Sequence, residues 1–298
     1  MLEPSVLATV KRIFFKTEKL SSEILAGEYK SAFKGTGLNF ESIREYQYGD
    51  EIKNLDWKVT ARMQKPFIRQ YKEERQMKLL LVVDFSASSK FGTGEKTKRE
   101  LITEVSSVLA FLAVKNNDKV GLMIITEEVE LYIKPKSGKA HIFRLIKELV
   151  SFKTKKTGTN IKFSLESLIK LSPKHSIIFY FSDFLDNHSS SIDYFKHELK
   201  ILKRSRDLNL VSVRDPKEFS LTNLGFLEIL NPETQEKKIV NLNKKNVRDL
   251  IEQSQREVQK NIELGLRKLG IKFLEIQTDK DYVLSLERFL NYSRIGLL

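Results

Sequence analysis

Two short runs of consecutive apolar residues constrain the fold of this chain more than any other feature. Residues 79–83 read Leu-Leu-Leu-Val-Val, and residues 177–181 read Ile-Ile-Phe-Tyr-Phe. Continuous apolar runs of this length are typical of strands covered on both faces, as in parallel sheets packed between helices. The two runs therefore predict two buried strands of an α/β domain.

After residue 78, segments with helical periodicity alternate with further strand-like segments. This alternation is typical of βαβ units and of a mostly parallel, doubly wound sheet with helices on both faces. We therefore predict an α/β fold. The predicted strands are 79–84, 118–126, 129–133, 176–182, 208–213 and 271–276, and the predicted helices are 96–116, 140–150, 161–171, 194–203, 244–269 and 279–290.

The chain of 298 residues is expected to form one elaborated domain with an N-terminal appendage. We predict the appendage at residues 1–76 and the α/β domain at residues 77–298, with a β-hairpin inserted near 225–242. The appendage is predicted to contain an amphipathic helix at 4–25, a turn at 35–37, and short strands at 39–46 and 67–73.

The composition excludes several kinds of chemistry. The chain has no cysteine, which removes disulfides, thiolate catalysis and cysteine-based metal centres. Its four histidines lack the spacing of a zinc site. The N-terminal residues lack a cleavable signal pattern, and the apolar runs fall far short of the ~20 residues that span a bilayer. We therefore expect a soluble, cytoplasmic protein.

Positive charge is concentrated in one segment of the chain. Residues 134–174 carry eleven Lys or Arg residues against two acidic residues, Glu148 and Glu166, and so hold most of the net charge of +13. One interpretation is a solvated basic face that aids solubility. The other is a docking surface toward which the positive field steers an anionic partner.

Polar side chains follow the first apolar run directly. Asp84, Ser86 and Ser88 form an Asp-x-Ser-x-Ser pattern at the carboxyl end of a predicted buried strand, where open α/β sheets bind ligands. One carboxylate and two hydroxyls are hard oxygen ligands that suit Mg²⁺ or Mn²⁺. Because the hydroxyls are neutral, such a cation would still need an anion from outside.

Two further oxygen-bearing residues lie where the same fold would supply them. Thr159 precedes the predicted 161–171 helix, and Asp183 follows the second apolar run. Both fall beside Asp84 provided that the two buried strands are neighbours. The alternative roles are local: the hydroxyls of the first turn and of Thr159 would cap helices, and Asp183 would be a turn residue.

Taken in this order, the Asp-x-Ser-x-Ser pattern, Thr159 and Asp183 resemble the metal-ion-dependent adhesion site of von Willebrand factor A domains. By this resemblance, Ser86, Ser88 and Thr159 would bind the metal directly. Asp84 and Asp183 would act largely through water, and a partner protein would supply the remaining carboxylate.

Longer stretches of the chain are similar to the bacterial family catalogued as domain of unknown function 58. They are residues 34–62, 183–186, 215–218 and 277–281. The resemblance covers nearly the whole chain. It implies a partner of MoxR-type AAA+ ATPases that acts with other von Willebrand factor A proteins in chaperone-like assembly or metal loading.

The 34–62 stretch is rich in aromatic and charged residues. Aromatic side chains in a folded segment are expected to be largely buried. We therefore predict that Tyr46, Tyr48 and Trp57 are buried anchors, and that Arg44 and Arg62 pair with nearby acidic residues. The alternative is a surface that faces a partner.

Together these observations predict a non-catalytic, metal-assisted protein-binding module. One alternative is a Mg²⁺-dependent phosphoesterase at the same oxygen site, although no general base or in-line nucleophile is evident. Another is a binder of nucleic acid or anionic surfaces through residues 134–174, although no recognition motif accompanies the charge. Residues 92–97 resemble a phosphate-binding loop only superficially, because the spacing of the motif is wrong.

Overall fold

The computed structural model describes residues 4–26, 38–73, 76–184, 191–218, 225–230, 237–241 and 243–295. Its strands are β1 (Leu38–Glu45), β2 (Phe67–Glu73), β3 (Lys78–Asp84), β4 (Lys119–Ile125), β5 (Val129–Lys136), β6 (Ile177–Ser182), β7 (Asp207–Arg214), β8 (Phe226–Leu230), β9 (Lys237–Asn241) and β10 (Lys272–Gln277). Its α-helices are α1 (Pro4–Ala26), α2 (Trp57–Met63), α3 (Lys98–Lys115), α4 (Lys139–Ser151), α5 (Ile161–Leu171), α6 (Lys196–Ser205), α7 (Lys245–Lys268) and α8 (Val283–Ile295).

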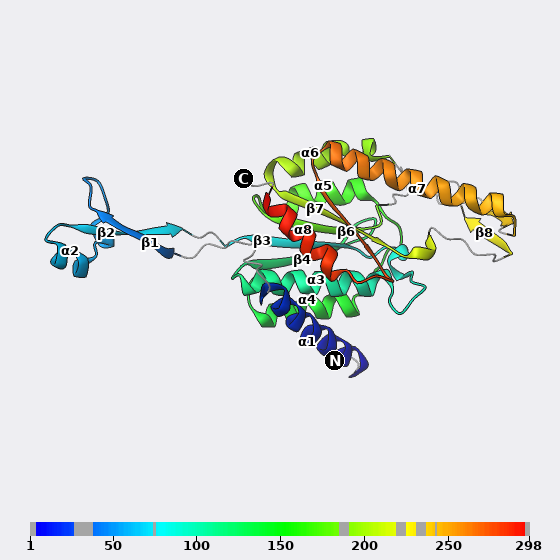
Figure 1. Cartoon of the computed structure of the whole chain (residues 1–298). Coiled ribbons are helices and arrows are strands. Elements are labelled where there is room, and N and C mark those ends of the chain that lie inside the picture. The colour runs from blue at the N-terminus through cyan, green and yellow to red at the C-terminus, as the bar shows by residue number, and fades with distance from the viewer. Residues whose placement is uncertain are drawn as a thin grey trace.

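A six-stranded sheet forms the centre of the molecule (Figure 1). Its strand order is β10-β7-β6-β3-β4-β5, and neighbouring strands are parallel except β4 and β5. From β3 the chain builds β4 and β5 on one side, then returns to build β6, β7 and β10 on the other. The strand order therefore reverses at β3, and the prediction of a mostly parallel, doubly wound α/β sheet is confirmed.

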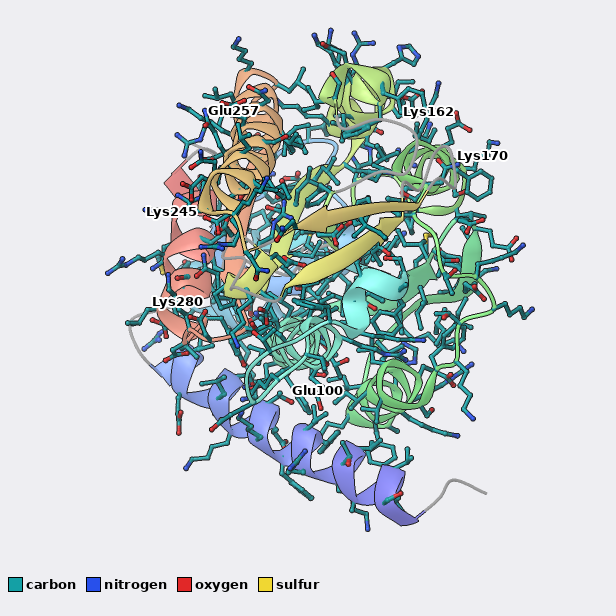
Figure 2. All side chains as sticks on the ribbon, turned by 90° about the vertical axis from the view of Figure 1, so that its right-hand side faces the viewer. Glu100, Lys162, Lys170, Lys245, Glu257 and Lys280 are labelled. Carbon is teal, nitrogen blue, oxygen red and sulfur yellow. The ribbon has the colours of Figure 1, made fainter. Side chains whose placement is uncertain are left out.

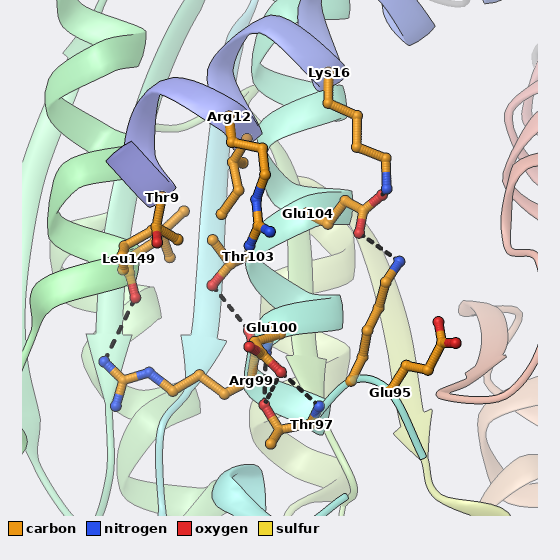
Figure 3. Close-up of a pocket in the computed structure, with 13 residues that line it drawn as sticks. Thr9, Arg12, Lys16, Glu95, Thr97, Arg99, Glu100, Thr103, Glu104 and Leu149 are labelled. Carbon is orange, nitrogen blue, oxygen red and sulfur yellow. Dashed lines mark hydrogen bonds and ion pairs between the residues drawn. The ribbon is translucent and has the colours of Figure 1, made fainter. Parts of the chain in front are cut away.

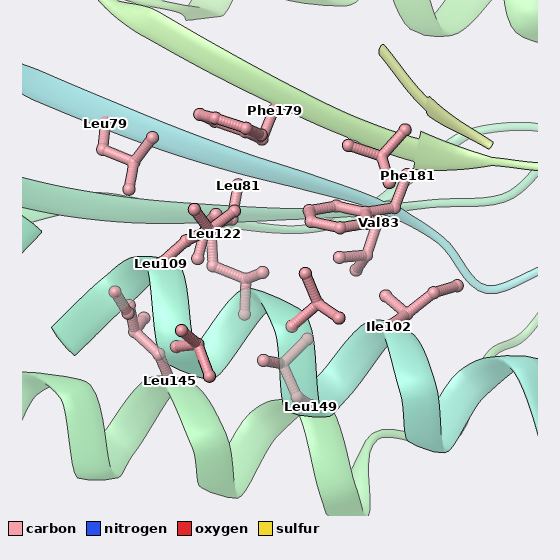
Figure 4. Close-up of a cluster of buried hydrophobic side chains, with 14 of the residues drawn as sticks. Leu79, Leu81, Val83, Ile102, Leu109, Leu122, Leu145, Leu149, Phe179 and Phe181 are labelled. Carbon is pink, nitrogen blue, oxygen red and sulfur yellow. The ribbon is translucent and has the colours of Figure 1, made fainter. Parts of the chain in front are cut away.

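Helices cover both faces of this sheet because β3 is apolar on both sides. Leu79, Leu81 and Val83 pack into one buried cluster with residues of α1, α3, α4 and α8 (Figure 4). Leu80 and Val82 pack into a second cluster with residues of α5, α6 and α7. Alternate residues of one strand thus serve opposite layers, which explains the unbroken apolar run.

The N-terminal helix α1 belongs to the first of these layers. It packs against α3 and α4, and its Val10 and Ile24 are buried in the first cluster. The Phe14 and Phe111 rings meet edge to face with centroids 4.9 Å apart. The predicted helix at 4–25 is confirmed, whereas the division of the chain at residue 76 stays a prediction.

Between α1 and the sheet, the chain forms a separate arm. Strands β1 and β2 pair antiparallel, and α2 lies between them in the sequence. Figure 1 shows this arm extending away from the amino end of β3. The predicted strands at 39–46 and 67–73 are confirmed, and the predicted turn at 35–37 lies outside the described residues.

A hairpin and a long helix follow β7. Strands β8 and β9 pair antiparallel, which confirms the predicted hairpin, and α7 is 24 residues long. The hairpin lies on the side of the molecule where the parallel strands end (Figures 1 and 2). None of the helices in the described ranges is both long and apolar enough to cross a membrane.

Candidate cation site and exposed arm

The chain leaves β3 through a tight turn that hydrogen bonds hold in place. The Ser86 backbone N donates to Asp84 Oδ1 at 2.9 Å, and Ser89 Oγ donates to the Ser86 carbonyl at 2.7 Å. The hydroxyl oxygens of Ser86 and Ser88 lie 3.1 Å apart. The Asp-x-Ser-x-Ser pattern therefore gathers its oxygen-bearing side chains at one point.

The end of β6 lies beside this turn. Strands β3 and β6 are parallel neighbours, so Asp183 follows its strand at the same edge as Asp84. Between them, Ser182 Oγ donates to Asp84 Oδ2 at 2.8 Å. Sequence reasoning did not identify Ser182, although its place directly before Asp183 at a strand end was the available signal.

Thr159 is buried nearby, on the segment that precedes α5. This segment contacts the first turn through a hydrogen bond from the Ala87 backbone N to the Thr157 carbonyl, at 2.8 Å. Thr159 does not cap α5. The N-cap is Asn160, whose side chain accepts from the Phe163 backbone N at 2.9 Å.

A buried lysine, which sequence reasoning missed, lies at the centre of the site. Lys98 Nζ lies 3.0 Å from Asp183 Oδ2 and also donates to Glu218 Oε1. The Lys98 side chain is only 2% exposed. It is the first residue of α3, where the helix dipole favours acidic side chains. A lysine at a position where acidic residues are preferred was the only signal in the sequence that Lys98 has a special role.

Glu218 is held against Lys98 by a polar network. The Asp215 backbone N donates to Glu218 Oε2 at 3.1 Å. The Asp215 carboxylate in turn accepts from Thr93 Oγ1 at 2.7 Å and from Thr278 Oγ1 at 2.8 Å. The 92–97 segment, which resembles a phosphate-binding loop, thus serves as a structural clamp through Thr93.

The two aspartates have opposite electrostatic settings. Burial, followed by the negative charge of Asp183, raises the pKa of Asp84 to about 6. Burial would also raise the pKa of Asp183, but the charge of Lys98, a hydrogen bond from Ser88 and the charge of Arg214 outweigh it and lower that pKa. Asp183 is therefore the firmly ionised carboxylate, and Lys98 is its counter-ion.

As they lie, these residues do not fit a divalent cation. The cavity bounded by Asp84, Ser88, Lys98 and Asp183 measures only about 10 Å³, roughly the space of one water molecule. Mg²⁺ requires six oxygen ligands and usually keeps several waters. Thr159 is not among the residues that line this cavity. Within the described ranges, no group of three or more His, Asp or Glu side chains is placed to hold a metal ion.

The site is equally unsuited to acid–base chemistry in this geometry. Both carboxylate oxygens of Asp84 accept protein hydrogen bonds, and Asp183 is paired with Lys98. A general base must reach the proton that it removes from a bound substrate. Because Asp84 and Asp183 are both buried, neither carboxylate is open to a substrate.

A larger pocket, of about 470 Å³, lies between α1 and α3 (Figure 3). Glu104 is one of its lining residues, with Oε1 2.6 Å from Lys16 Nζ and Oε2 2.7 Å from Lys96 Nζ. Glu104 also accepts from Tyr282 Oη at 3.0 Å. These contacts join α1, α3 and the start of α8, so we interpret this region as a structural junction.

The arm exposes several of its large apolar side chains. Trp57 is 70% exposed and Tyr48 is fully exposed, with Ile52 and Met63 also largely in solvent. The prediction of buried anchors is therefore wrong for Trp57 and Tyr48, and Tyr46 is only half-buried. The physical reason is that a two-stranded arm with one short helix has too little interior to bury them.

Polar contacts nevertheless give the arm a defined shape. Arg44 donates to both oxygens of Asp50, at 2.8 and 2.7 Å, which confirms the predicted pairing of Arg44. Asp56 caps α2 by accepting from two backbone N–H groups. Arg62 is exposed. The exposed aromatic side chains are thus presented from a structured support.

The fold and the strand ends define an α/β domain with a buried, oxygen-rich edge at the point where the strand order reverses. Residues 42–261 match the family described as protein of unknown function DUF58, and the chain belongs to this family.

Similar proteins include Rv1480, an uncharacterised protein of Mycobacterium tuberculosis. It is 22% identical over 298 residues, and the match covers 99% of this chain and 92% of that protein. BatB from Bacteroides thetaiotaomicron has a similar structure, with a TM-score of 0.44, 12% identity, and coverage of 73% of this chain and 98% of BatB. The VWA domain of SpRpn10 gives a TM-score of 0.43, 9% identity, and coverage of 74% and 96%.

Proposed function

We propose that this chain is a non-catalytic protein-binding module whose main contact surface is the arm. The observation that carries the proposal is the exposure of Trp57 and Tyr48 on a structured element. Large aromatic side chains in water lose the stabilisation that burial provides, and Trp and Tyr are the residues that most often dominate binding energy. A surface that keeps them exposed is best explained by a partner that covers them.

The contacts within the arm support this proposal. The paired Arg44 and Asp50 side chains and the capped start of α2 fix the backbone from which Trp57 projects. A surface that is already ordered loses less conformational entropy when it binds. The arm therefore has both the side chains and the rigidity that a binding surface needs.

The proposed partner is a MoxR-type AAA+ ATPase, toward which the chain would act as an adaptor or chaperone-like partner, together with other von Willebrand factor A proteins. This identity rests on the sequence resemblance. The basic 134–174 segment favours an acidic protein surface as the partner, because opposite charges speed the encounter.

Metal assistance is the second part of the proposal. Mg²⁺ or Mn²⁺ would be held by Ser86, Ser88 and Thr159, with Asp84 and Asp183 acting through water. In the described geometry, the ion pair between Lys98 and Asp183 must break before the metal ion can bind. We therefore assign the main contact to the arm and not to the edge of the sheet.

The test is binding of the purified chain to the immobilised MoxR-type ATPase of the same organism. Replacing both Trp57 and Tyr48 with Ala should weaken binding by about tenfold or more. Leu250→Ala is the matched control, since Leu250 is 67% exposed on α7, outside the arm. Equal binding by the arm variant and the control would refute the proposal.

A further inference from the structure

Asp183 is already neutralised by a positive charge that belongs to the protein. Lys98 Nζ lies 3.0 Å from Asp183 Oδ2, and the exposed fractions of the two side chains are 2% and 3%. A buried ammonium is tolerated only where carboxylates and hydrogen bonds replace its water. Here Asp183 and Glu218 supply both.

The ammonium and a metal ion would compete for the same space. Lys98, Asp183, Asp84 and Ser88 bound a cavity of about 10 Å³, which has no room for a hydrated ion. A divalent cation bound there would also lie next to the Lys98 charge without solvent between them, and like charges repel strongly at that range. The two cations therefore exclude one another.

We infer that Lys98 is the resident cation of this edge, and that Mg²⁺ or Mn²⁺ enters only after the Lys98 ammonium has released Asp183. The inference deepens the metal-assisted part of the proposed function and rests on it. It is independent of binding by the arm.

Glu218 gives the released ammonium another partner. Its second oxygen is fixed by the Asp215 backbone N at 3.1 Å, and Asp215 is itself held by Thr93 and Thr278. When the Lys98 ammonium moves away from Asp183, it thus keeps the carboxylate of Glu218 as a partner. Release of Asp183 therefore does not leave the ammonium unpaired, and the carboxylate of Asp183 becomes available to the incoming metal ion.

The test is thermal unfolding of the full chain in EDTA and in millimolar Mg²⁺. The midpoint of the wild type should be the same in both. Lys98→Met keeps the length of the side chain and removes its charge. It should lower the midpoint in EDTA by about 5–10 °C, and Mg²⁺ should restore part of that loss. Lys96→Met, which alters a pair outside this edge, should show no response to Mg²⁺.

Two results would overturn the inference. One is a wild type that Mg²⁺ stabilises as much as it stabilises Lys98→Met. The other is a Lys98→Met variant that folds but does not respond to Mg²⁺. The binding assay of the Trp57 and Tyr48 variant leaves Lys98 and Asp183 unchanged. Failure of the proposed arm function would therefore be distinguished from failure of this inference.

Asp183→Asn provides an independent measurement should Lys98→Met fail to fold. If Lys98 is the resident cation, this variant loses stability in EDTA because the ammonium keeps only Glu218 as a charged partner. A site built for a metal makes the opposite prediction. There, Asp183→Asn gains stability in EDTA because repulsion between Asp84 and Asp183 disappears.

Discussion

Lys98 Nζ lies 3.0 Å from Asp183 Oδ2, and this ion pair joins two residues that are 85 positions apart in the chain. Lys98 begins α3, and Asp183 follows β6. A buried ion pair adds less net stability than its attraction indicates, since both groups lose water. Its effect here is positional: it fixes the start of α3 against the carboxyl ends of the central strands.

Glu104 should stabilise the junction of α1 and α3 in a pH-dependent way. Burial raises its pKa, but the hydrogen bonds and charges of Lys16 and Lys96 outweigh burial, so its pKa is lowered. The folded state therefore favours the carboxylate. The resulting stability is present above the unfolded pKa of about 4.3 and is lost as the pH falls through the lower folded value.

Glu104→Gln should therefore lower the free energy of unfolding by roughly 1–2 kcal/mol at pH 7, and by less near pH 3. Urea denaturation at the two pH values measures this. Glu23→Gln is the control, because Glu23 is exposed and lies 3.8 Å from Lys19. An equal loss at both pH values would show that Glu104 acts through packing and not through its charge.

Asp118 should have the opposite effect on stability. It is fully buried, and Oδ1 accepts from the Met77 backbone N at 2.8 Å, while Oδ2 has no hydrogen-bond partner among the described residues. Burial raises the pKa of Asp118 to about 6. Between about pH 4 and 6 the folded state binds more protons than the unfolded state, so this residue costs stability as the pH rises through that range.

Asp118→Asn keeps the oxygen that accepts from Met77 and removes the charge. It should raise the free energy of unfolding by about 1–3 kcal/mol at pH 7, with the gain disappearing near pH 3.5. Chemical denaturation across this pH range measures the effect. A loss of stability at pH 7 would mean that the ionised form has a partner that this geometry does not provide.

The sequence predicts the strands well because burial on both faces leaves a local signal. The runs at 79–83 and 177–181 each lie inside a strand, and their polar ends bring Asp84 and Asp183 to one edge. Lys98 could not be predicted in the same way. Its partner Asp183 is distant in the chain, and a lysine at the start of a helix is ordinarily a surface residue.

Trp57 shows a second limit of local patterns. Aromatic residues among paired charges are typical of a small buried cluster, and Arg44 does pair with Asp50 as predicted. Whether an aromatic side chain is buried depends on the elements that pack over it. In the described part of the chain, no element packs over Trp57, and the sequence of the arm alone does not indicate this.

The fluorescence of the protein should report the state of the arm directly, because Trp57 is the only tryptophan in the chain. With 70% exposure, its emission should lie close to that of tryptophan in water, and acrylamide should quench it readily. Binding of the proposed partner should shift the emission to shorter wavelength. Blue-shifted emission from the isolated protein that acrylamide quenches poorly would instead support the prediction that Trp57 is a buried anchor.

The basic 134–174 segment should control the rate at which the partner associates. Lys153, Lys155 and Lys156 are exposed, and the backbone N–H groups of the last two donate to Glu130 Oε1 at 3.0 and 2.9 Å. Within the described residues, Glu130 therefore holds the loop through backbone N–H groups and not through lysine side chains. Replacing all three lysines with Glu should leave the unfolding temperature unchanged and slow association at low salt.

A matched variant separates local steering from net charge. Replacing Lys245, Lys260 and Lys268 on α7 with Glu changes the net charge by the same amount, at exposed positions outside this loop. Stopped-flow association rates at several salt concentrations compare the two variants. Steering by the loop predicts a larger reduction for the 153–156 variant, and a difference that vanishes as salt screens it. Equal reductions would assign the effect to net charge. In a separate measurement, metal-independent and steeply salt-dependent binding of duplex DNA would favour the nucleic-acid alternative.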